Sequence, residues 1–111
     1  MENYPIHYYK LDVREYKGFL FPMPEHDAGR DDILIFVEYG ENVNNPKETV
    51  YQAWGQRKDH PTMRCLVSDG TVPTKSLKDN AAQAIITVLN ESDDFINEVK
   101  RFGEWSDSSL E

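Results

Sequence analysis

Hydrophobic and polar residues alternate along much of the first two thirds of the chain, which is the pattern of half-buried β-strands. The strands predicted in this way span residues 7–13, 19–21, 33–39, 49–56 and 62–68. Within residues 49–56, Val50 and Trp54 fall on one face of the strand, and Tyr51 and Ala53 fall on the other.

The segment Ile33–Tyr39 contains no polar side chain before Glu38, so we expect a central strand that is covered on both faces. The stretch Gly40–Glu48 is predicted to form a loop. The basic residues Arg57 and Lys58 are expected to lie in a solvated polar loop between two strands. Asp69-Gly70 predicts a turn after the last strand.

The period changes to a helical one after residue 75. From Ser76 to Asn90 the apolar residues recur at helical spacing, with Ser76 or Thr74 as the expected N-cap. Ser92 is the predicted N-cap of a second helix, whose end is expected at Gly103.

Strands followed by helices predict an α+β fold, with an antiparallel sheet of about four or five strands packed against one or two C-terminal helices. The length of 111 residues fits a single domain, which we place over residues 1–105. Residues 106–111 are expected to form a disordered tail, and Leu110-Glu111 resembles a cloning scar.

The charge balance of the chain is strongly acidic, with 20 Asp and Glu against 12 Lys and Arg and a formal net charge of −8. Such a surface repels nucleic acids and anionic membranes, because both need cations on the protein. The sequence has no basic, apolar signal segment and no apolar run of membrane-spanning length, so a cytoplasmic location is expected.

One polar loop carries residue types that bind divalent metals or act as general bases. Its candidate ligands are Glu25, His26, Asp27 and Asp31. Their spacing does not match a calcium-binding loop, and a solvated turn explains the same composition.

The chain contains a single cysteine, Cys65, so it can form no disulfide within itself. Because Cys65 falls inside a predicted strand, we expect a buried, unreactive thiol. No nucleophile elbow, phosphate-binding loop or dinucleotide-binding turn is present in the sequence, and we expect no cofactor.

Acidity is concentrated near the C-terminus. Residues 91–111 contain seven acidic and two basic side chains, a difference of −5. Acidic residues beside a tryptophan form a surface suited to a basic protein partner. The candidate partner-binding residues are Glu91, Asp94, Glu98, Trp105 and Trp54.

These observations favour a small non-catalytic interaction protein that binds and blocks a basic surface of a protein partner, as inhibitors, immunity proteins, antitoxins and phage antagonists do. One alternative is a small metal-dependent enzyme or ligand-binding domain that uses the Glu25–Asp32 loop. Another is a subunit of a larger assembly, which predicts self-association into a homo-oligomer.

Overall fold

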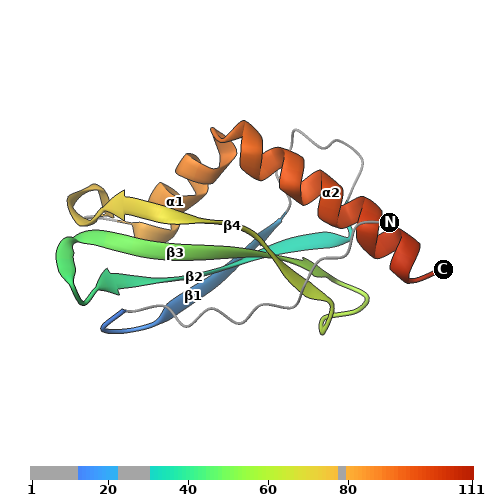
Figure 1. Cartoon of the computed structure of the whole chain (residues 1–111), viewed down its shortest axis with the longest axis horizontal. Coiled ribbons are helices and arrows are strands. Elements are labelled where there is room, and N and C mark those ends of the chain that lie inside the picture. Colours follow the sequence, from blue (N-terminus) through green and yellow to red (C-terminus); the bar gives the residue numbers. More distant parts are fainter. Residues whose placement is uncertain (1–12, 23–30, 78–79) are drawn as a thin grey trace.

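The computed structural model of the chain describes residues 13–22, 31–77 and 80–111. Its elements are β1 (Lys17–Pro22), β2 (Ile33–Asn42), β3 (Asn45–Arg57), β4 (Arg64–Pro73), the 3₁₀ helix η1 (Thr74–Leu77), α1 (Ala81–Asn90) and α2 (Asp93–Ser109). The strands form one antiparallel sheet in the order β1-β2-β3-β4, and the two α-helices lie on one face of it (Figure 1). The predicted α+β class is therefore confirmed.

The strand predicted over residues 7–13 lies outside the described residues except for Val13. Val13 forms an isolated antiparallel bridge with Asn42 at the end of β2. Helices in the described part of the chain are too short or too polar to cross a lipid bilayer.

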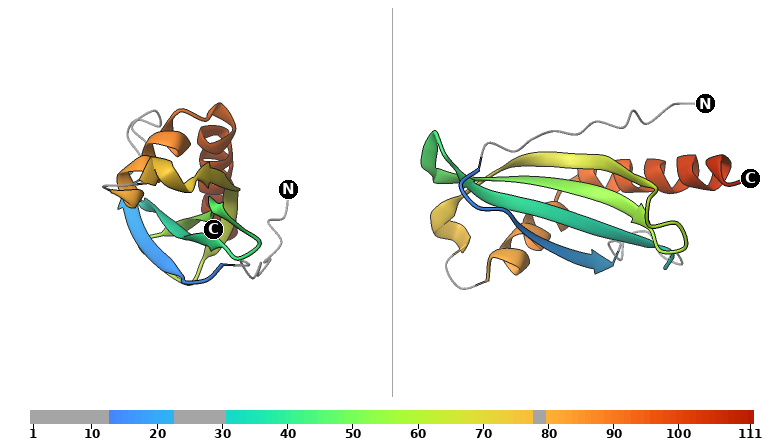
Figure 2. Two further views of the ribbon diagram at one scale, coloured as in Figure 1. Left: turned by 90° about the vertical axis from the view of Figure 1, so that its left-hand side faces the viewer. Right: turned by 90° about the horizontal axis from the view of Figure 1, so that it is seen from below.

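β2 is a central strand, but only one of its faces is fully covered. Ile33, Ile35 and Val37 are completely buried, whereas Leu34 and Phe36 on the other face remain partly exposed. The prediction of cover on both faces is wrong, because both α-helices pack against the same side of the sheet (Figure 2).

The central strands are longer than the sequence predicted. β2 and β3 meet in a tight hairpin at Val43-Asn44 rather than in a long loop, and Asn42 Oδ1 accepts a hydrogen bond from Asn44 N at 2.9 Å. β4 runs through Asp69-Gly70 without turning, because Gly70 pairs with Tyr51 of β3. A Cβ atom at Gly70 would lie 2.8 Å from the Tyr51 hydroxyl oxygen, so a larger residue there would require the Tyr51 side chain to shift.

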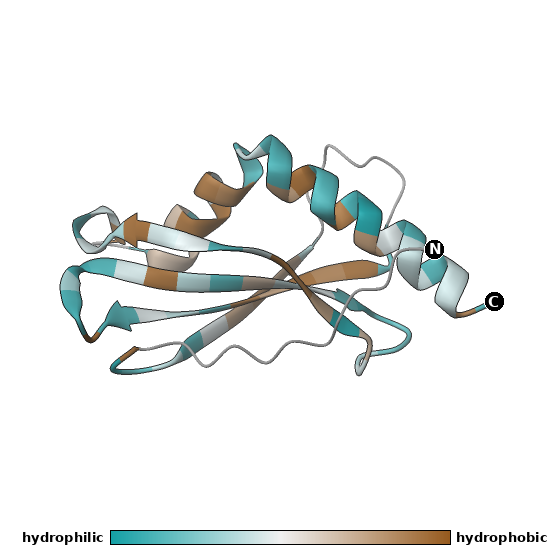
Figure 3. Ribbon diagram, in the orientation of Figure 1, coloured by the Kyte–Doolittle hydropathy of each residue, from teal (hydrophilic) through white to brown (hydrophobic). Residues whose placement is uncertain are grey.

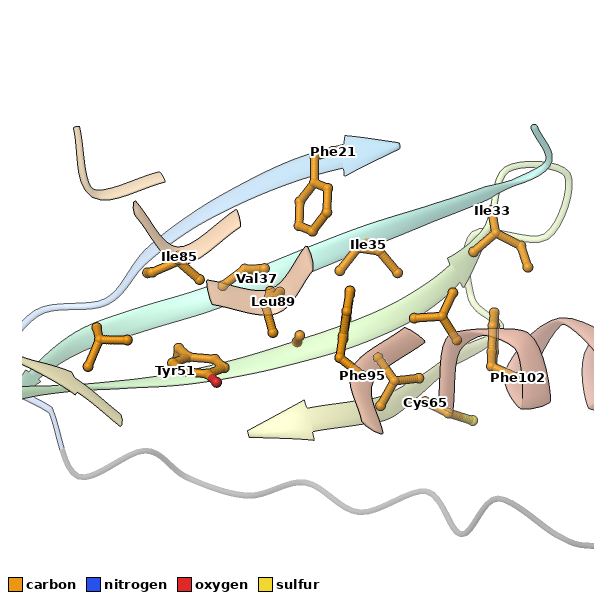
Figure 4. Packing of buried hydrophobic residues seen from close by; sticks show 14 residues of the cluster. Phe21, Ile33, Ile35, Val37, Tyr51, Cys65, Ile85, Leu89, Phe95 and Phe102 are labelled. Atoms are coloured by element: carbon orange, nitrogen blue, oxygen red, sulfur yellow. The ribbon is translucent and has the colours of Figure 1, made fainter. Parts of the chain in front are cut away.

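The core lies between the sheet and the helices (Figure 4). α1 contributes Ile85 and Leu89, and hydrophobic residues make up most of this helix (Figure 3). Hydrophobic and hydrophilic residues recur in turn along α2, because one face of this helix is buried against the sheet and the other is exposed.

The helices begin and end differently from the prediction at two points. α1 begins at Ala81 with Asn80 as its N-cap, not at Ser76, and η1 precedes it. α2 does not end at Gly103. It continues to Ser109, so most of the expected 106–111 tail is helical.

Candidate interaction surface

The first turn of α2 is stabilised by its own sequence. Ser92 is the N-cap, and its Oγ accepts a hydrogen bond from Phe95 N at 3.2 Å. Asp93 and Asp94 occupy the first turn, where negative charge interacts favourably with the positive end of the helix dipole. The break between the two helices and the role of Ser92 are as the sequence predicted.

One side of α2 is fixed against the sheet by fully buried side chains. Phe95, Val99 and Phe102 have no exposed surface. The Phe102 ring lies directly over Gly55 of β3, where a Cβ atom would come within 2.7 Å of Phe102 Cδ2. This contact sets the distance and the rotation of α2, and with them the direction in which its other side chains point.

One flank of α2 brings together most of the predicted partner-binding residues. Asp94, Glu98 and Trp105 are spaced four and seven residues apart, so they share a face of the helix. Arg101 lies between them, and its Nη1 donates to Glu98 Oε1 at 3.1 Å. Glu91 is exposed just before the helix. We call Glu91, Asp94, Glu98, Arg101 and Trp105 the acidic flank.

Trp105 is the aromatic member of the acidic flank. Its ring packs beside Phe102, with the two centroids 6.0 Å apart, and it contacts the edge of the core. Part of the indole remains exposed. The side chain therefore packs against the core while part of its surface stays exposed.

The C-terminal half of α2 is joined to the sheet by Arg57, the last residue of β3. The guanidinium group contacts three carboxylates: Asp107 at 2.6 Å, Asp59 at 3.0 Å and Asp32 at 3.2 Å. Its Nη1 also donates to Ser106 Oγ at 3.3 Å. The Arg57 side chain is only 9% exposed. We call this arrangement the Arg57 cluster.

The charges in the Arg57 cluster stabilise one another. The hydrogen bond to Asp59 contributes most to raising the pKa of Arg57, and Asp107 and Asp32 add to it while burial opposes it. The hydrogen bond from Arg57 in turn lowers the pKa of Asp59. Arg57 and Asp59 therefore stay charged near neutral pH.

Sequence reasoning placed Arg57 in a solvated loop and missed this cluster. The available signal was the alternation of β3, which puts Arg57 on the same face as Tyr51 and Ala53 if the strand is extended by one residue. Three aspartates then explain why a buried cation is tolerated: Asp59 is two residues along the chain, and Asp32 and Asp107 come from distant parts of it.

Trp54 does not belong to the acidic flank. It pairs with Phe36 of β2 and Leu66 of β4, and these side chains point to the sheet face away from the helices. The nearby Arg64 guanidinium lies 4.4 Å from the centre of the Phe36 ring and donates to Gln56 Oε1. The two tryptophans therefore lie on opposite sides of the sheet.

The predicted metal ligands Glu25, His26 and Asp27 lie outside the described residues. Asp31 is described, and it is exposed. Among the described residues no group of three or more histidine, cysteine or acidic side chains is arranged to hold a metal ion. His60 is exposed, with its Nε2 3.8 Å from Asp59 Oδ2.

Cys65 is buried in β4, as predicted, and burial raises the pKa of its thiol to about 11. The thiol therefore stays protonated at neutral pH and is a poor nucleophile.

A cavity of about 270 Å³ lies between the beginning of β1 and the beginning of α1. Its lining includes two basic and two acidic side chains, namely Arg14, Lys17, Glu15 and Glu41. The formal charges of these four side chains cancel.

Comparison of the chain with protein-family models, with curated proteins and with solved structures gives no match.

Proposed function

We propose that this protein is a small non-catalytic interaction protein that binds a basic surface of a partner protein and blocks it through the acidic flank of α2. The observation that carries the proposal is the alignment of Asp94, Glu98 and Trp105 along one face of a single helix. An aromatic anchor inside a charged rim is the arrangement in which a few residues supply most of the binding energy.

The electrostatics of the whole chain support the same partner. The net charge is −8, and the difference between acidic and basic residues over residues 91–111 is −5. This field attracts a basic surface over a distance of about one Debye length and increases the rate of encounter. Acidic groups on the rim then reject partners of the same charge.

The way α2 is held also supports the proposal. The Ser92 cap fixes its first turn, and the Arg57 cluster fixes its last turns. Between these ends, the Phe102 ring packs so closely against Gly55 that α2 cannot move nearer to β3. A surface that is already rigid loses little conformational entropy on binding, so more of the contact energy appears as affinity.

Affinity capture with charge-reversed variants tests the proposal. Asp94→Lys places a cation in the acidic flank. Asp93→Lys is the matched control, because it makes the same charge change in the same helical turn but lies about 100° further round the helix. Both variants lose one favourable contact with the helix dipole, so any difference between them reports the position of the charge.

We expect wild-type protein and Asp93→Lys to capture the same partner in stoichiometric amounts from a lysate of the source organism, and Asp94→Lys to bind it at least about tenfold more weakly. Binding should weaken as salt is raised. Equal binding by the two variants would refute the role of the acidic flank. Failure of every bait to retain a stoichiometric partner would refute the interaction function.

A further inference from the structure

The cavity between the start of β1 and the start of α1 has the features of a binding site that is separate from the acidic flank. Its volume of about 270 Å³ lies just below the roughly 300–1,000 Å³ of sites for drug-sized ligands, so it admits a smaller molecule. Its walls come from the residues before β1, from β2 and β3, and from η1 and the start of α1. No residue of α2, which the structure describes in full, lines it.

Two rows of paired residues place groups of opposite charge beside each other in this cavity. In one row, Lys17 of β1 pairs with Tyr39 of β2. In the next row, Glu41 of β2 pairs with Thr49 of β3. Both rows face the helices, because Tyr39 and Glu41 follow the buried Val37 at intervals of two along β2. The rows are two residues apart on this strand, or about 7 Å.

The row of Glu41 and Thr49 can bind a group that donates hydrogen bonds. Thr74 Oγ1 donates to the carbonyl oxygen of Pro46 at 2.9 Å. A hydroxyl group has one proton, so the 3.0 Å contact between Thr74 Oγ1 and Thr49 Oγ1 uses the proton of Thr49. Both hydroxyl groups can then only accept further hydrogen bonds, and an ionised carboxylate at Glu41 is also an acceptor. This part of the cavity therefore suits an ammonium group.

The same cavity also presents hydrogen-bond donors. Lys17 belongs to the neighbouring row, Arg14 lines the wall before β1, and both side chains only donate. The backbone N–H of Arg14 donates to Glu41 O at 3.1 Å, which fixes this wall against β2. Ala81, the first residue of α1, adds the positive end of a helix dipole. These groups suit a carboxylate.

The lining contains equal numbers of acidic and basic side chains, namely Arg14, Lys17, Glu15 and Glu41. In the part of the chain that the structure describes, no ion pair uses any of these four side chains. A ligand with one charge of each sign complements such a lining better than an anion or a polyamine does. Leu77 adds an apolar surface to the same cavity.

We propose that this cavity binds a free α-amino acid with an aliphatic side chain. The ammonium group of the ligand donates to Glu41 and Thr49. Its carboxylate accepts from Lys17 and Arg14. The two charged groups of an α-amino acid are joined through a single carbon, so the molecule bridges rows about 7 Å apart with a charge-assisted hydrogen bond at each end. The aliphatic side chain packs against Leu77.

The test uses the full-length protein with L-alanine, L-valine and L-leucine as probes. Binding is measured by isothermal titration calorimetry and by the rise in melting temperature, since a ligand that binds only the folded state stabilises it. Each amino acid is compared with the amine and with the carboxylic acid that carry the same side chain. We expect the amino acid to bind at least about tenfold more tightly than either analogue, because each analogue lacks one charged group.

Glu41→Gln keeps the size of the side chain but removes the negative charge beside Thr49. Glu48→Gln is the matched control, because Glu48 precedes Thr49 on β3 and its side chain lies on the opposite face of the strand. We expect Glu41→Gln to weaken binding at least about tenfold and Glu48→Gln to leave it unchanged.

Three results would each overturn the proposal: no binding of any of the three amino acids, equal binding of an amino acid and its two analogues, or equal binding by the two variants. Because the readout is binding of a small molecule and not capture of a partner, the result is independent of the acidic flank.

Discussion

Replacement of Arg57 by methionine should strongly destabilise the fold, because Arg57 connects β3 to the last turns of α2. Methionine keeps most of the buried hydrocarbon stem but removes every ion pair of the Arg57 cluster. Breaking a fully buried ion pair costs about 3–5 kcal/mol. The carboxylates left behind are 37–52% exposed and can return to water, so we expect a smaller loss, about 2–3 kcal/mol.

Urea denaturation measures this loss. With a slope of about 1.5 kcal/mol/M for a domain of this size, the midpoint should fall by roughly 1.3–2 M. Arg64→Met is the matched control, because Arg64 loses its contact with the Phe36 ring and its hydrogen bonds to Gln56 Oε1 but no ion pair, and should cost about 1–2 kcal/mol. Hydrogen exchange should also accelerate in the amides of residues 104–109. Equal midpoints for the two variants would refute the proposed role of the Arg57 cluster.

Three further predictions concern the packing and the titration of the core and its edge. Gly55→Ala should lower the free energy of unfolding by about 1–3 kcal/mol, measured by urea denaturation, because the new methyl group meets the Phe102 ring. The pKa of Asp59 is lowered in the fold, so its stabilisation is complete above the ordinary carboxyl range and is lost as the pH falls through the lowered value. As the pH is lowered from 7 to about 3, the urea midpoint should therefore fall less steeply in Asp59→Asn than in the wild type. Cys65 should react with a thiol reagent at neutral pH only at the rate of unfolding, because burial raises its pKa to about 11; a fast reaction with the folded protein would contradict this.

The fold class could be predicted from the sequence because hydrophobic periodicity reports which faces are buried. The alternation in β3 correctly separated Val50 and Trp54 from Tyr51 and Ala53. The hairpin at Val43-Asn44 could not be predicted, since the strand residues beside it are mostly polar and carry no periodic hydrophobic signal.

The end of α2 depended on tertiary contacts that the local sequence does not encode. Gly103 usually favours the end of a helix, but here it is buried, and the helix continues because Ser106 is buried and Asp107 binds Arg57. The sequence predicted Glu91, Asp94, Glu98 and Trp105 as partner-binding residues from the concentration of acidic side chains beside a tryptophan, and the structure places Asp94, Glu98 and Trp105 on one face of α2. Trp54 lies on the other side of the sheet and does not share this surface, which the sequence could not show because it depends on the strand register.

Hydrogen exchange of the complex with the captured partner tests the proposed binding surface most directly. The partner should slow exchange in residues 91–105 of α2 and leave β4 unchanged. Partner-induced protection that maps to the sheet strands, or to no part of the chain, would contradict the assignment of binding to the acidic flank.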